Sequence, residues 1–378
     1  MKRVRVRAGH EPYDVIIGGG VLAGRNLAPI LGRASACFVV SSPRVMDLHG
    51  DRLSRALQDS KAPVAGTILL RDGEAAKTAR EWQRASAAMA RAVLDRRALV
   101  IAFGGGSVGD AAGFAASTYA RGIGFVQIPT TLLAMVDSSV GGKTGINLPE
   151  GKNLVGSFHQ PRLVIADTSL LKTLPAREKQ SGVYEILKCG LIRSRALLAL
   201  IRGTDGLRRA SEGQLETAIA EAVRIKARIV ERDERESGDR ILLNYGHTLG
   251  HALEAATNYG VFTHGEAVGY GMEFAADFAT ATGVTTDGVA VEIRDAVRSL
   301  GPRVALQPPL ARRLRGAMLR DKKRDGDAIR EILIRVPGRP VVQRIPAATF
   351  ADAAAAWVRA EADDVSAGRR ANYSPIRS

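Results

Sequence analysis

Residues 99–110 read LVIAFGGGSVGD. The five apolar residues predict a buried strand, and the stretch 111–117 behind the loop predicts a helix. Between them, Gly104, Gly105 and Gly106 let the backbone approach a pyrophosphate, whose charge then meets the N–H groups at the helix start. The stretch therefore predicts a strand–loop–helix unit of an α/β fold, with phosphate binding favoured because the polar Asp110 follows directly.

The same alternation of strands and helices extends to about residue 170. Strand-like runs occur at 13–17, 36–40, 64–70, 99–103 and 125–128, with helical patterns such as 45–57 and 78–95 between them. This order predicts a parallel sheet built from βαβ units. Beyond Pro175 helical periodicity dominates at 177–200, 212–234, 247–257 and 266–282, with strand-like returns at 330–336 and 340–344. We expect an α/β domain over 1–175, a helical domain over 176–367 and a disordered tail over 368–378.

A second glycine loop, at 18–23, reads GGGVLA. A standard dinucleotide fold places an acidic ribose ligand about 20 residues after its loop. Here the loop at 18–23 leads to serines at 41–42, and the loop at 104–106 leads to threonines at 130–131. We interpret the loop at 18–23 as a tight strand-to-helix turn, and the loop at 104–106 as the one that binds phosphate.

The composition excludes several classes of protein. The chain has 378 residues and 40.2 kDa, and its 46% hydrophobic residues exclude a disordered chain. Its two cysteines, Cys37 and Cys189, are too few for a disulfide framework or a cysteine-rich zinc module. No apolar run approaches the roughly 18 residues of a membrane span, and no signal peptide is visible. We therefore expect a cytoplasmic protein without a membrane partner.

The net charge of +15 raises nucleic acid as a partner. Of the 54 basic residues, 43 are Arg and only 11 are Lys, and the arginines are scattered along the chain. No finger, basic-zipper or RNA-recognition signature accompanies them. We favour an arginine-rich solvated surface over nucleic-acid binding, and we expect the scarce lysines where an ammonium group is needed.

A polar stretch with two of these lysines follows the strand at 125–128. It reads PTTLLAMVDSSVGGKTGIN over 129–147, and GKN follows at 151–153. Its GGKT is similar to the end of a P-loop, but Asp137 stands where that motif needs its first glycine. We therefore predict a glycine-backed loop that binds an anionic small molecule through Lys143, Lys152 and Asn153.

Three of the six histidines fall within 18 residues. His247 and His251 are four apart and share one face of a helix. Thr263 and Glu266 make a capping box that puts His264 in the first turn of the next helix. Two helix starts can thus aim imidazoles at one point, which suits a divalent metal, with Zn²⁺ the default for imidazole plus carboxylate.

The spacing leaves the carboxylate ligand open among Glu185, Glu254 and Glu266. The alternative is a set of solvated histidines on helix surfaces, but three histidines with glycine neighbours and a nearby acid favour the metal. Glu185 and Lys188 are three apart on one predicted helix. They form either a common solvated ion pair or, given the apolar residues around them, a buried one.

Together these segments resemble the 3-dehydroquinate synthases of the sugar-phosphate cyclase superfamily. The matching segments run in the family's order from about residue 70 to 325: 104–110, 121–122, 129–147, 151–153, Glu185 with Lys188, Arg240 with 244–254, 264–272 and 321–323. As a set they are highly specific.

The resemblance implies an N-terminal Rossmann-like NAD-binding α/β domain and an all-α C-terminal domain, with the active site in the interdomain cleft. It also implies NAD⁺, one divalent metal (Zn²⁺ or Co²⁺) and a homodimer. The substrate would be 3-deoxy-D-arabino-heptulosonate 7-phosphate, and the products 3-dehydroquinate and phosphate, in the shikimate pathway. The implied reaction runs through transient oxidation, phosphate elimination, reduction, ring opening and an intramolecular aldol closure, for which positioning is most of the task.

The same resemblance assigns residues. Glu185, His247 and His264 would be the metal ligands. The NAD contacts would be Glu74, Lys77, Gly104, Gly105, Gly106, Asp110, Thr130, Thr131 and Thr173. Lys226 and Arg240 would hold the substrate carboxylate, and Lys152, Asn153, Asn244, His251 and Lys322 or Lys323 the phosphate, with Arg121 from a second subunit. Asp137, Lys143 and Lys188 would lie around the ring hydroxyls and, with His251, be the catalytic residues.

Three other functions are alternatives. A related cyclase, such as the amino-dehydroquinate variant, shares most of these residues. A metal- and NAD-dependent polyol dehydrogenase would not need the anion-binding residues, and would accumulate NADH without releasing phosphate. A nucleic-acid-binding protein would show tight, salt-sensitive binding without turnover.

Overall fold

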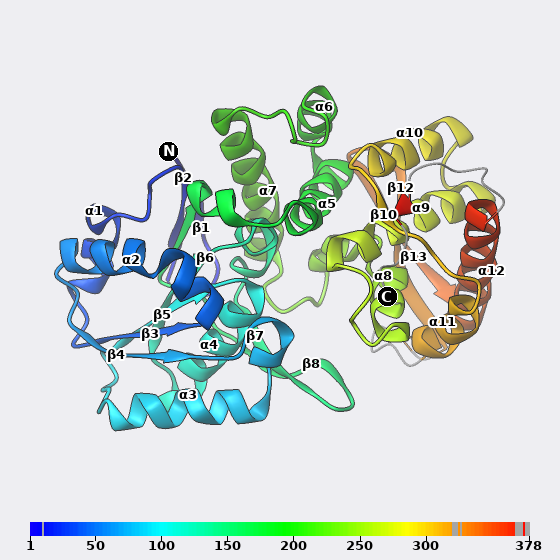
Figure 1. The fold of residues 1–378 in the computed structure, drawn as a ribbon. Helices are drawn as coiled ribbons and strands as arrows, with labels where there is room; N and C mark the ends of the chain where they lie inside the picture. Colours follow the sequence, from blue (N-terminus) through cyan, green and yellow to red (C-terminus); the bar gives the residue numbers. More distant parts are fainter. Residues whose placement is uncertain (10, 320–323, 326, 367–372, 375–378) are drawn as a thin grey trace. The chain divides into compact units, whose positions relative to one another are not determined.

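Strand β5 (Leu99–Gly104) and helix α4 (Gly106–Thr118) form from the stretch that opens the sequence analysis, as predicted. They belong to a computed structural model that describes the chain except residues 10, 320–323, 326, 367–372 and 375–378. The chain divides into two units, Met1–Lys179 with Glu212–Arg235 and Gln180–Ser211 with Glu236–Ser378. Figure 1 shows the elements of both.

The first unit is built on a seven-stranded sheet in the order β1-β2-β9-β6-β5-β3-β4. All neighbouring strands are parallel except β1, which pairs antiparallel with β2. Besides β5, the strands are β1 (Lys2–Val6), β2 (Tyr13–Gly18), β3 (Cys37–Ser41), β4 (Val64–Leu69), β6 (Gly124–Pro129) and β9 (Leu163–Asp167). The predicted parallel α/β architecture is thus confirmed.

Helices cover both faces of this sheet, and its inner strands β3, β5, β6 and β9 are accordingly buried on both sides along almost their whole length. Ile101 and Phe103 of β5 belong to one buried cluster with side chains of α1 (Gly24–Leu31) and α2 (Pro43–Asp59). The alternate residue Val100 belongs to a second cluster with α4 and α3 (Ala79–Arg91). Figure 1 shows α2 and α3 on either side of the strands.

Helix α7 (Glu212–Arg232) also belongs to the first unit, where it packs against β1. It lies within the stretch expected as a separate helical domain over 176–367. The side chains of α7 therefore contact residues of the first unit that are distant in sequence, such as those of β1.

The predicted glycine-backed loop is wrong, because residues 143–158 form an antiparallel hairpin of β7 (Lys143–Leu148) and β8 (Gly151–Phe158). A Cβ on Gly156 would lie 2.2 Å from the carbonyl oxygen of Thr144 on the opposite strand. The glycine therefore serves close strand pairing rather than loop flexibility. The three residues predicted to bind an anion all lie on this hairpin: Lys143, Lys152 and Asn153.

The second unit is mainly helical, as predicted. Its helices are α5 (Ala176–Arg193), which enters it at Gln180, α6 (Arg195–Gly203), α8 (His247–Ala256), α9 (His264–Ala281), α10 (Asp287–Arg298), α11 (Leu310–Leu319) and α12 (Ala347–Ser366). The helical pattern at 177–200 is broken at Ser194, whose side chain accepts a hydrogen bond from Leu197 N and caps α6.

The strand-like returns form a small antiparallel sheet beside these helices. It contains β11 (Arg324–Asp325), β12 (Ala328–Val336) and β13 (Arg339–Pro346). Of the expected tail, Tyr373–Ser374 pairs as β14 with β10 (Arg303–Val304), and the rest of 368–378 lies outside the described residues. Among the helices that the structure describes, none has the length and apolar character needed to cross a bilayer.

Candidate functional site

Helices α8 and α9 pack closely because glycines on α9 and at the start of α8 let their backbones meet. Gly246, directly before α8, has a φ of +77°, in the left-handed region that favours glycine. A Cβ on Gly271 of α9 would lie 1.7 Å from the Gly246 carbonyl oxygen. This contact places the start of α8 against the middle of α9, and the rings of His247 and His264, the first residues of the two helices, have centroids 5.2 Å apart.

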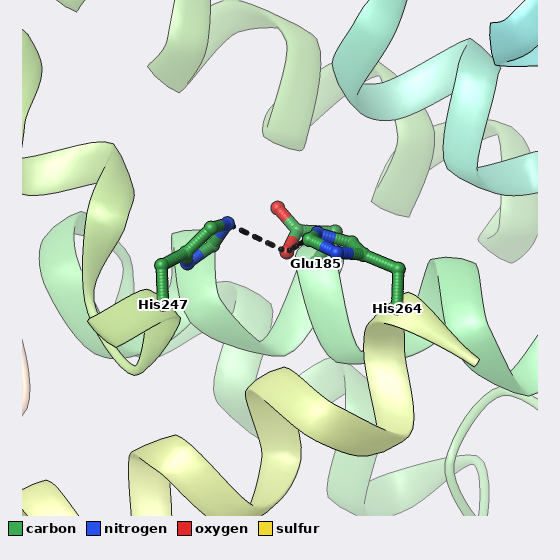
Figure 2. A group of neighbouring side chains, drawn as sticks. All are labelled: Glu185, His247 and His264. Atoms are coloured by element: carbon green, nitrogen blue, oxygen red, sulfur yellow. Dashed lines mark ion pairs between the residues drawn. The ribbon is translucent and has the colours of Figure 1, made fainter. Parts of the chain in front are cut away.

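Both imidazoles face Glu185 of α5 (Figure 2). Glu185 Oε1 lies 3.7 Å from His247 Nε2 and 3.6 Å from His264 Nε2, and the ligand atoms of all three residues lie within 4.8 Å of one another. Because nitrogen and oxygen ligands bind Zn²⁺ at about 2.0–2.2 Å, one ion fits among atoms this close. Of the three carboxylates that the spacing left open, Glu185 is the one that meets both Nε2 atoms.

Each of these three side chains has a partner behind it. His247 Nδ1 lies 3.1 Å from the carbonyl oxygen of Tyr245, and His264 Nδ1 lies 3.2 Å from Glu254 Oε2. Lys188 Nζ donates to Glu185 Oε2. Glu185 and Lys188 are each 1% exposed, so the solvated ion pair considered from the sequence is wrong and the pair is buried.

Two carboxylates, those of Glu254 and Glu185, lie next to the His264 imidazole. Burial lowers the pKa of the imidazole, but the carboxylates of Glu254 and Glu185 outweigh burial and raise the pKa of His264 to about 10. In the absence of metal the His264 imidazole is therefore protonated on both nitrogens. A divalent cation must displace one of these protons in order to bind, as at any histidine ligand.

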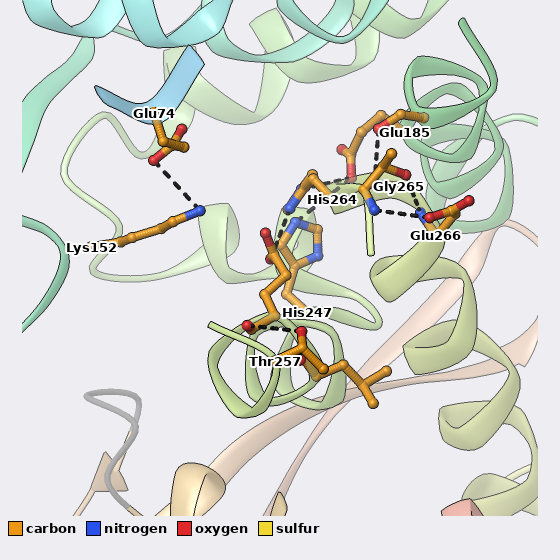
Figure 3. A network of polar contacts seen from close by, with 12 residues as sticks. Glu74, Lys152, Glu185, His247, Thr257, His264, Gly265 and Glu266 are labelled. Atoms are coloured by element: carbon orange, nitrogen blue, oxygen red, sulfur yellow. Dashed lines mark hydrogen bonds and ion pairs between the residues drawn. The ribbon is translucent and has the colours of Figure 1, made fainter. Parts of the chain in front are cut away.

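Glu266 has a different task from the other two acids. Its carboxylate accepts from Thr263 N at 2.8 Å while Thr263 Oγ1 accepts from Glu266 N, so the predicted capping box of α9 is confirmed. Gly265 N also donates to Ser181 Oγ of α5 at 3.0 Å. Figure 3 shows Gly265 and Glu266 beside His264 at the start of α9. The cap fixes the position of His264 at the helix start.

Three further predicted residues of the second unit lie on or just before α8. The ring of His251 lies 5.3 Å from that of His247. Arg240 is 2% exposed in η5 (Asp239–Asn244), and Asn244 Nδ2 at the end of η5 donates to Glu236 Oε1 at 2.6 Å. Lys322 and Lys323 lie outside the described residues.

In the first unit, the glycines between β5 and the start of α4 pack closely against the side chains of Thr131 and Ser138. A Cβ on Gly105 would lie 3.2 Å from Thr131 Cγ2, and one on Gly106 would lie 2.9 Å from Ser138 Oγ. Helix α4 begins without a capping side chain and without an acidic residue in its first turn. The N–H groups there suit an anion such as a pyrophosphate.

The loop at 18–23 shows the opposite arrangement. Gly19 N donates to Glu216 Oε1 at 3.0 Å, Gly20 N to Asp167 Oδ1 at 2.9 Å and Leu22 N to Asp167 Oδ2 at 2.9 Å. The chain's own carboxylates therefore occupy the positions where a phosphate would bind. Our interpretation of this loop as a structural turn is confirmed.

A polar network joins the predicted NAD contacts to the hairpin. Lys77 follows η1 (Gly73–Ala76), is 4% exposed and donates to Asp110 Oδ2 at 2.7 Å and to Asn153 Oδ1 at 2.5 Å. Burial lowers the pKa of Lys77, but Asp110 and Glu74 outweigh it and raise the pKa, so Lys77 stays charged. Glu74 pairs with Lys152 at 3.5 Å, as Figure 3 shows.

The remaining predicted residues of the first unit are spread over several elements. Thr130 and Thr131 follow β6, and Thr173 ends η4 (Thr168–Thr173), where its Oγ1 lies 2.9 Å from His49 Nε2. Arg121 is exposed in η2 (Tyr119–Arg121) with a φ of +66°. Asp137 of η3 (Ala134–Ser138) is paired with Lys226 of α7.

The structure adds residues that the sequence analysis did not single out. Asn147 Nδ2 donates to Glu74 Oε2 at 2.9 Å, and Asn147 Oδ1 accepts from Asn153 N at 3.0 Å. Ser107 Oγ donates to Glu74 Oε1 at 2.9 Å. Asn147 ends the polar stretch 129–147 and Ser107 follows the glycines at 104–106, so their position beside predicted site residues was the available signal.

Family models match most of this chain. The model described as 3-dehydroquinate synthase N-terminal matches residues 67–181, and the one described as 3-dehydroquinate synthase C-terminal matches residues 182–324. A relative named 3-dehydroquinate synthase, from Pelotomaculum thermopropionicum, is 46% identical over 305 residues, which are 80% of this chain and 81% of the relative.

Two solved structures have the same fold over nearly the whole chain. A 2-epi-5-epi-valiolone synthase from Streptomyces hygroscopicus subsp. jinggangensis, with NAD⁺ and Zn²⁺ bound, is 31% identical with a TM-score of 0.81, covering 94% of this chain and 99% of its own. A 2-deoxy-scyllo-inosose synthase complexed with carbaglucose-6-phosphate, NAD⁺ and Co²⁺ is 25% identical with a TM-score of 0.84, covering 95% and 100%.

Proposed function

The chain belongs to the 3-dehydroquinate synthase family, and we propose on this premise that it converts 3-deoxy-D-arabino-heptulosonate 7-phosphate to 3-dehydroquinate and phosphate. The enzyme is then a phosphate-eliminating carbon–oxygen lyase that depends on NAD⁺ and a divalent metal. The convergence of His247 Nε2 and His264 Nε2 on Glu185 Oε1 is the observation that carries this proposal.

The donor set supports the cofactors. Two imidazoles and one carboxylate make the three-ligand arrangement of catalytic zinc, and the solved relatives contain NAD⁺ with Zn²⁺ or Co²⁺. Glu185, His247 and His264 would hold the metal, and the glycine loop with Lys77 and Asp110 would hold NAD⁺. When bound, the metal polarises a secondary alcohol of the substrate, and NAD⁺ accepts and later returns a hydride.

The chain's own residues bind and orient the substrate. The Lys226 ammonium has a carboxylate partner, Asp137, in this structure, so a substrate carboxylate can replace one acceptor with another of the same chemistry. Lys188 keeps the Glu185 carboxylate fixed through its hydrogen bond. Since the aldol partners are parts of one molecule, holding the opened chain in a ring-like conformation supplies most of the closure step.

The product that is released and the net change in NADH distinguish this function from a polyol dehydrogenase and from the amino-dehydroquinate variant. Purified protein with NAD⁺ and Zn²⁺ is incubated with the heptulosonate phosphate and, separately, with its amino analogue. We expect stoichiometric phosphate, a carbocyclic product identified by mass spectrometry, and no net NADH absorbance. Net NADH without phosphate would indicate a polyol dehydrogenase, and turnover of the amino analogue alone would indicate the amino variant.

We also propose a cytoplasmic homodimer. Cys37 and Cys189 are buried and form no disulfide, which fits a reducing compartment. Strand β8 exposes Leu154 and Phe158, which are four residues apart and share one face of the hairpin, and these apolar side chains suit a contact with a second copy of the chain. Light scattering coupled to size exclusion tests the dimer, and a mass of one chain would contradict it.

A further inference from the structure

The imidazole of His264 lies between two carboxylates, one at each ring nitrogen. Its Nε2 faces Glu185 Oε1 at 3.6 Å, and its Nδ1 lies 3.2 Å from Glu254 Oε2. Glu254 stands near the end of α8 and is 7% exposed. A side chain that is this buried and this close to the ring has a defined orientation toward it.

The contact at Nδ1 decides which nitrogen can bind a metal. An ionised carboxylate only accepts hydrogen bonds, so Nδ1 keeps its proton on the Glu254 side, and Nε2, which faces Glu185, is the nitrogen whose proton a cation displaces. His247 has the same arrangement, with Nδ1 donating to the Tyr245 carbonyl at 3.1 Å and Nε2 facing Glu185. Both histidines are therefore oriented in the same sense, one by a backbone carbonyl and the other by Glu254.

We propose that Glu254 is a positioning residue of the metal centre, which holds His264 in the tautomer and ring orientation that bind the ion. The proposal rests on the proposed function, because it takes Glu185, His247 and His264 as the metal ligands. A carboxylate behind a histidine ligand also increases the basicity of the ring, and loss of such a partner typically weakens metal binding about 10- to 100-fold.

A second cation site is the competing use of Glu254. The ligand atoms of His251, Glu254 and His264 also lie within 4.8 Å of one another. In that arrangement His264 Nδ1 would bind a cation instead of donating to Glu254, and the chain would take up two ions. Metal stoichiometry therefore separates the two roles.

The test measures zinc affinity without turnover. The full chain is stripped of metal and titrated with Zn²⁺ against a chromophoric chelator, as wild type, Glu254→Ala and Glu254→Gln. Glu266→Gln is the matched control, because it removes a buried carboxylate two residues from His264 that caps α9 instead of contacting the ring. Thermal unfolding of each metal-free variant follows stability, and the absorption spectrum of the Co²⁺ form follows the geometry of the centre.

We expect one ion per chain, zinc binding about 10- to 100-fold weaker in Glu254→Ala, and a smaller loss in Glu254→Gln, whose amide oxygen still accepts from Nδ1. The Co²⁺ spectrum should change in Glu254→Ala. Glu266→Gln should leave zinc affinity and the Co²⁺ spectrum as in wild type, because a glutamine at this position still accepts from Thr263 N and keeps the cap that fixes His264.

Wild-type zinc affinity in Glu254→Ala would overturn the proposal. So would two ions in wild type and one in Glu254→Ala, which would assign a second cation site instead. If Glu254→Ala does not fold, Glu254→Gln decides by the same two criteria. A wild type that binds zinc but releases no phosphate would contradict the proposed function alone, because the affinity comparison needs no activity.

Discussion

Lys226 Nζ donates to Asp137 twice, to the side-chain Oδ1 at 2.5 Å and to the backbone carbonyl at 2.7 Å. The two residues are 89 positions apart, on α7 and η3, and Lys226 is 7% exposed. The pair ties α7 to the polar stretch that follows β6. It also keeps an ammonium group in a place where carboxylates are its partners.

Lys226→Ala should impair recognition of the substrate carboxylate. We expect kcat/KM to fall about 100-fold, mainly through KM, because a charge-assisted contact is lost. Steady-state phosphate release measures both constants. Lys172→Ala is the control, since Lys172 forms an exposed pair with Glu212 and should leave both constants unchanged. Unchanged KM and kcat in Lys226→Ala would remove this residue from the substrate site.

His247→Ala should abolish turnover because the metal is lost. Metal content by atomic absorption and phosphate release are measured on the same sample. His159→Ala is the control: its ring stacks on Phe125 in the first unit, and it should lower stability while keeping metal content. Activity with full metal content in His247→Ala would refute this ligand assignment.

Gly106→Ala should weaken NAD⁺ binding, because the added Cβ would lie 2.9 Å from Ser138 Oγ at the start of α4. We expect at least about a tenfold loss of affinity, the equivalent of about 1.4 kcal/mol, by calorimetry. Gly19→Ala in the other glycine loop is the control, since its Cβ meets only Thr168 Oγ1 at 3.8 Å. If Gly19→Ala alone lost NAD⁺ affinity, the cofactor would bind at the loop 18–23, and the assignment to the loop 104–106 would be wrong.

Gly271→Ala should destabilise the second unit, because its Cβ would lie 1.7 Å from the Gly246 carbonyl oxygen. Overpacking of this kind costs about 3 kcal/mol, measured by denaturant unfolding. Gly288→Ala in α10 meets nothing within 4 Å and should be neutral or slightly stabilising. Equal stability of the two variants would show that α8 and α9 are not held by this close approach.

Local features of the fold and of the site could be predicted from the sequence. The strand–loop–helix at 99–118 and the capping box of Thr263 and Glu266 depend on residues within a few positions of each other. The placement of His247 and His264 at two helix starts follows from the same short-range rules.

Features that depend on packing could not be predicted in this way. The choice of Glu185 over Glu254 and Glu266 depends on how α5, α8 and α9 rotate against one another. The pairing of Lys226 with Asp137 requires α7 to return to the first unit. The hairpin at 143–158 also depends on packing, because a glycine such as Gly156 is compatible with a loop by sequence but serves close strand contact in the structure.

The measurement that tests the central claim most directly is phosphate release from 3-deoxy-D-arabino-heptulosonate 7-phosphate with NAD⁺, before chelation, after chelation and after Zn²⁺ is restored. We predict release without net NADH, its loss on chelation and its return with Zn²⁺. In His264→Ala, phosphate release should not return when Zn²⁺ is restored after chelation. Phosphate release that survives complete metal removal, or NADH that accumulates without phosphate, would contradict a metal-dependent cyclase centred on Glu185, His247 and His264.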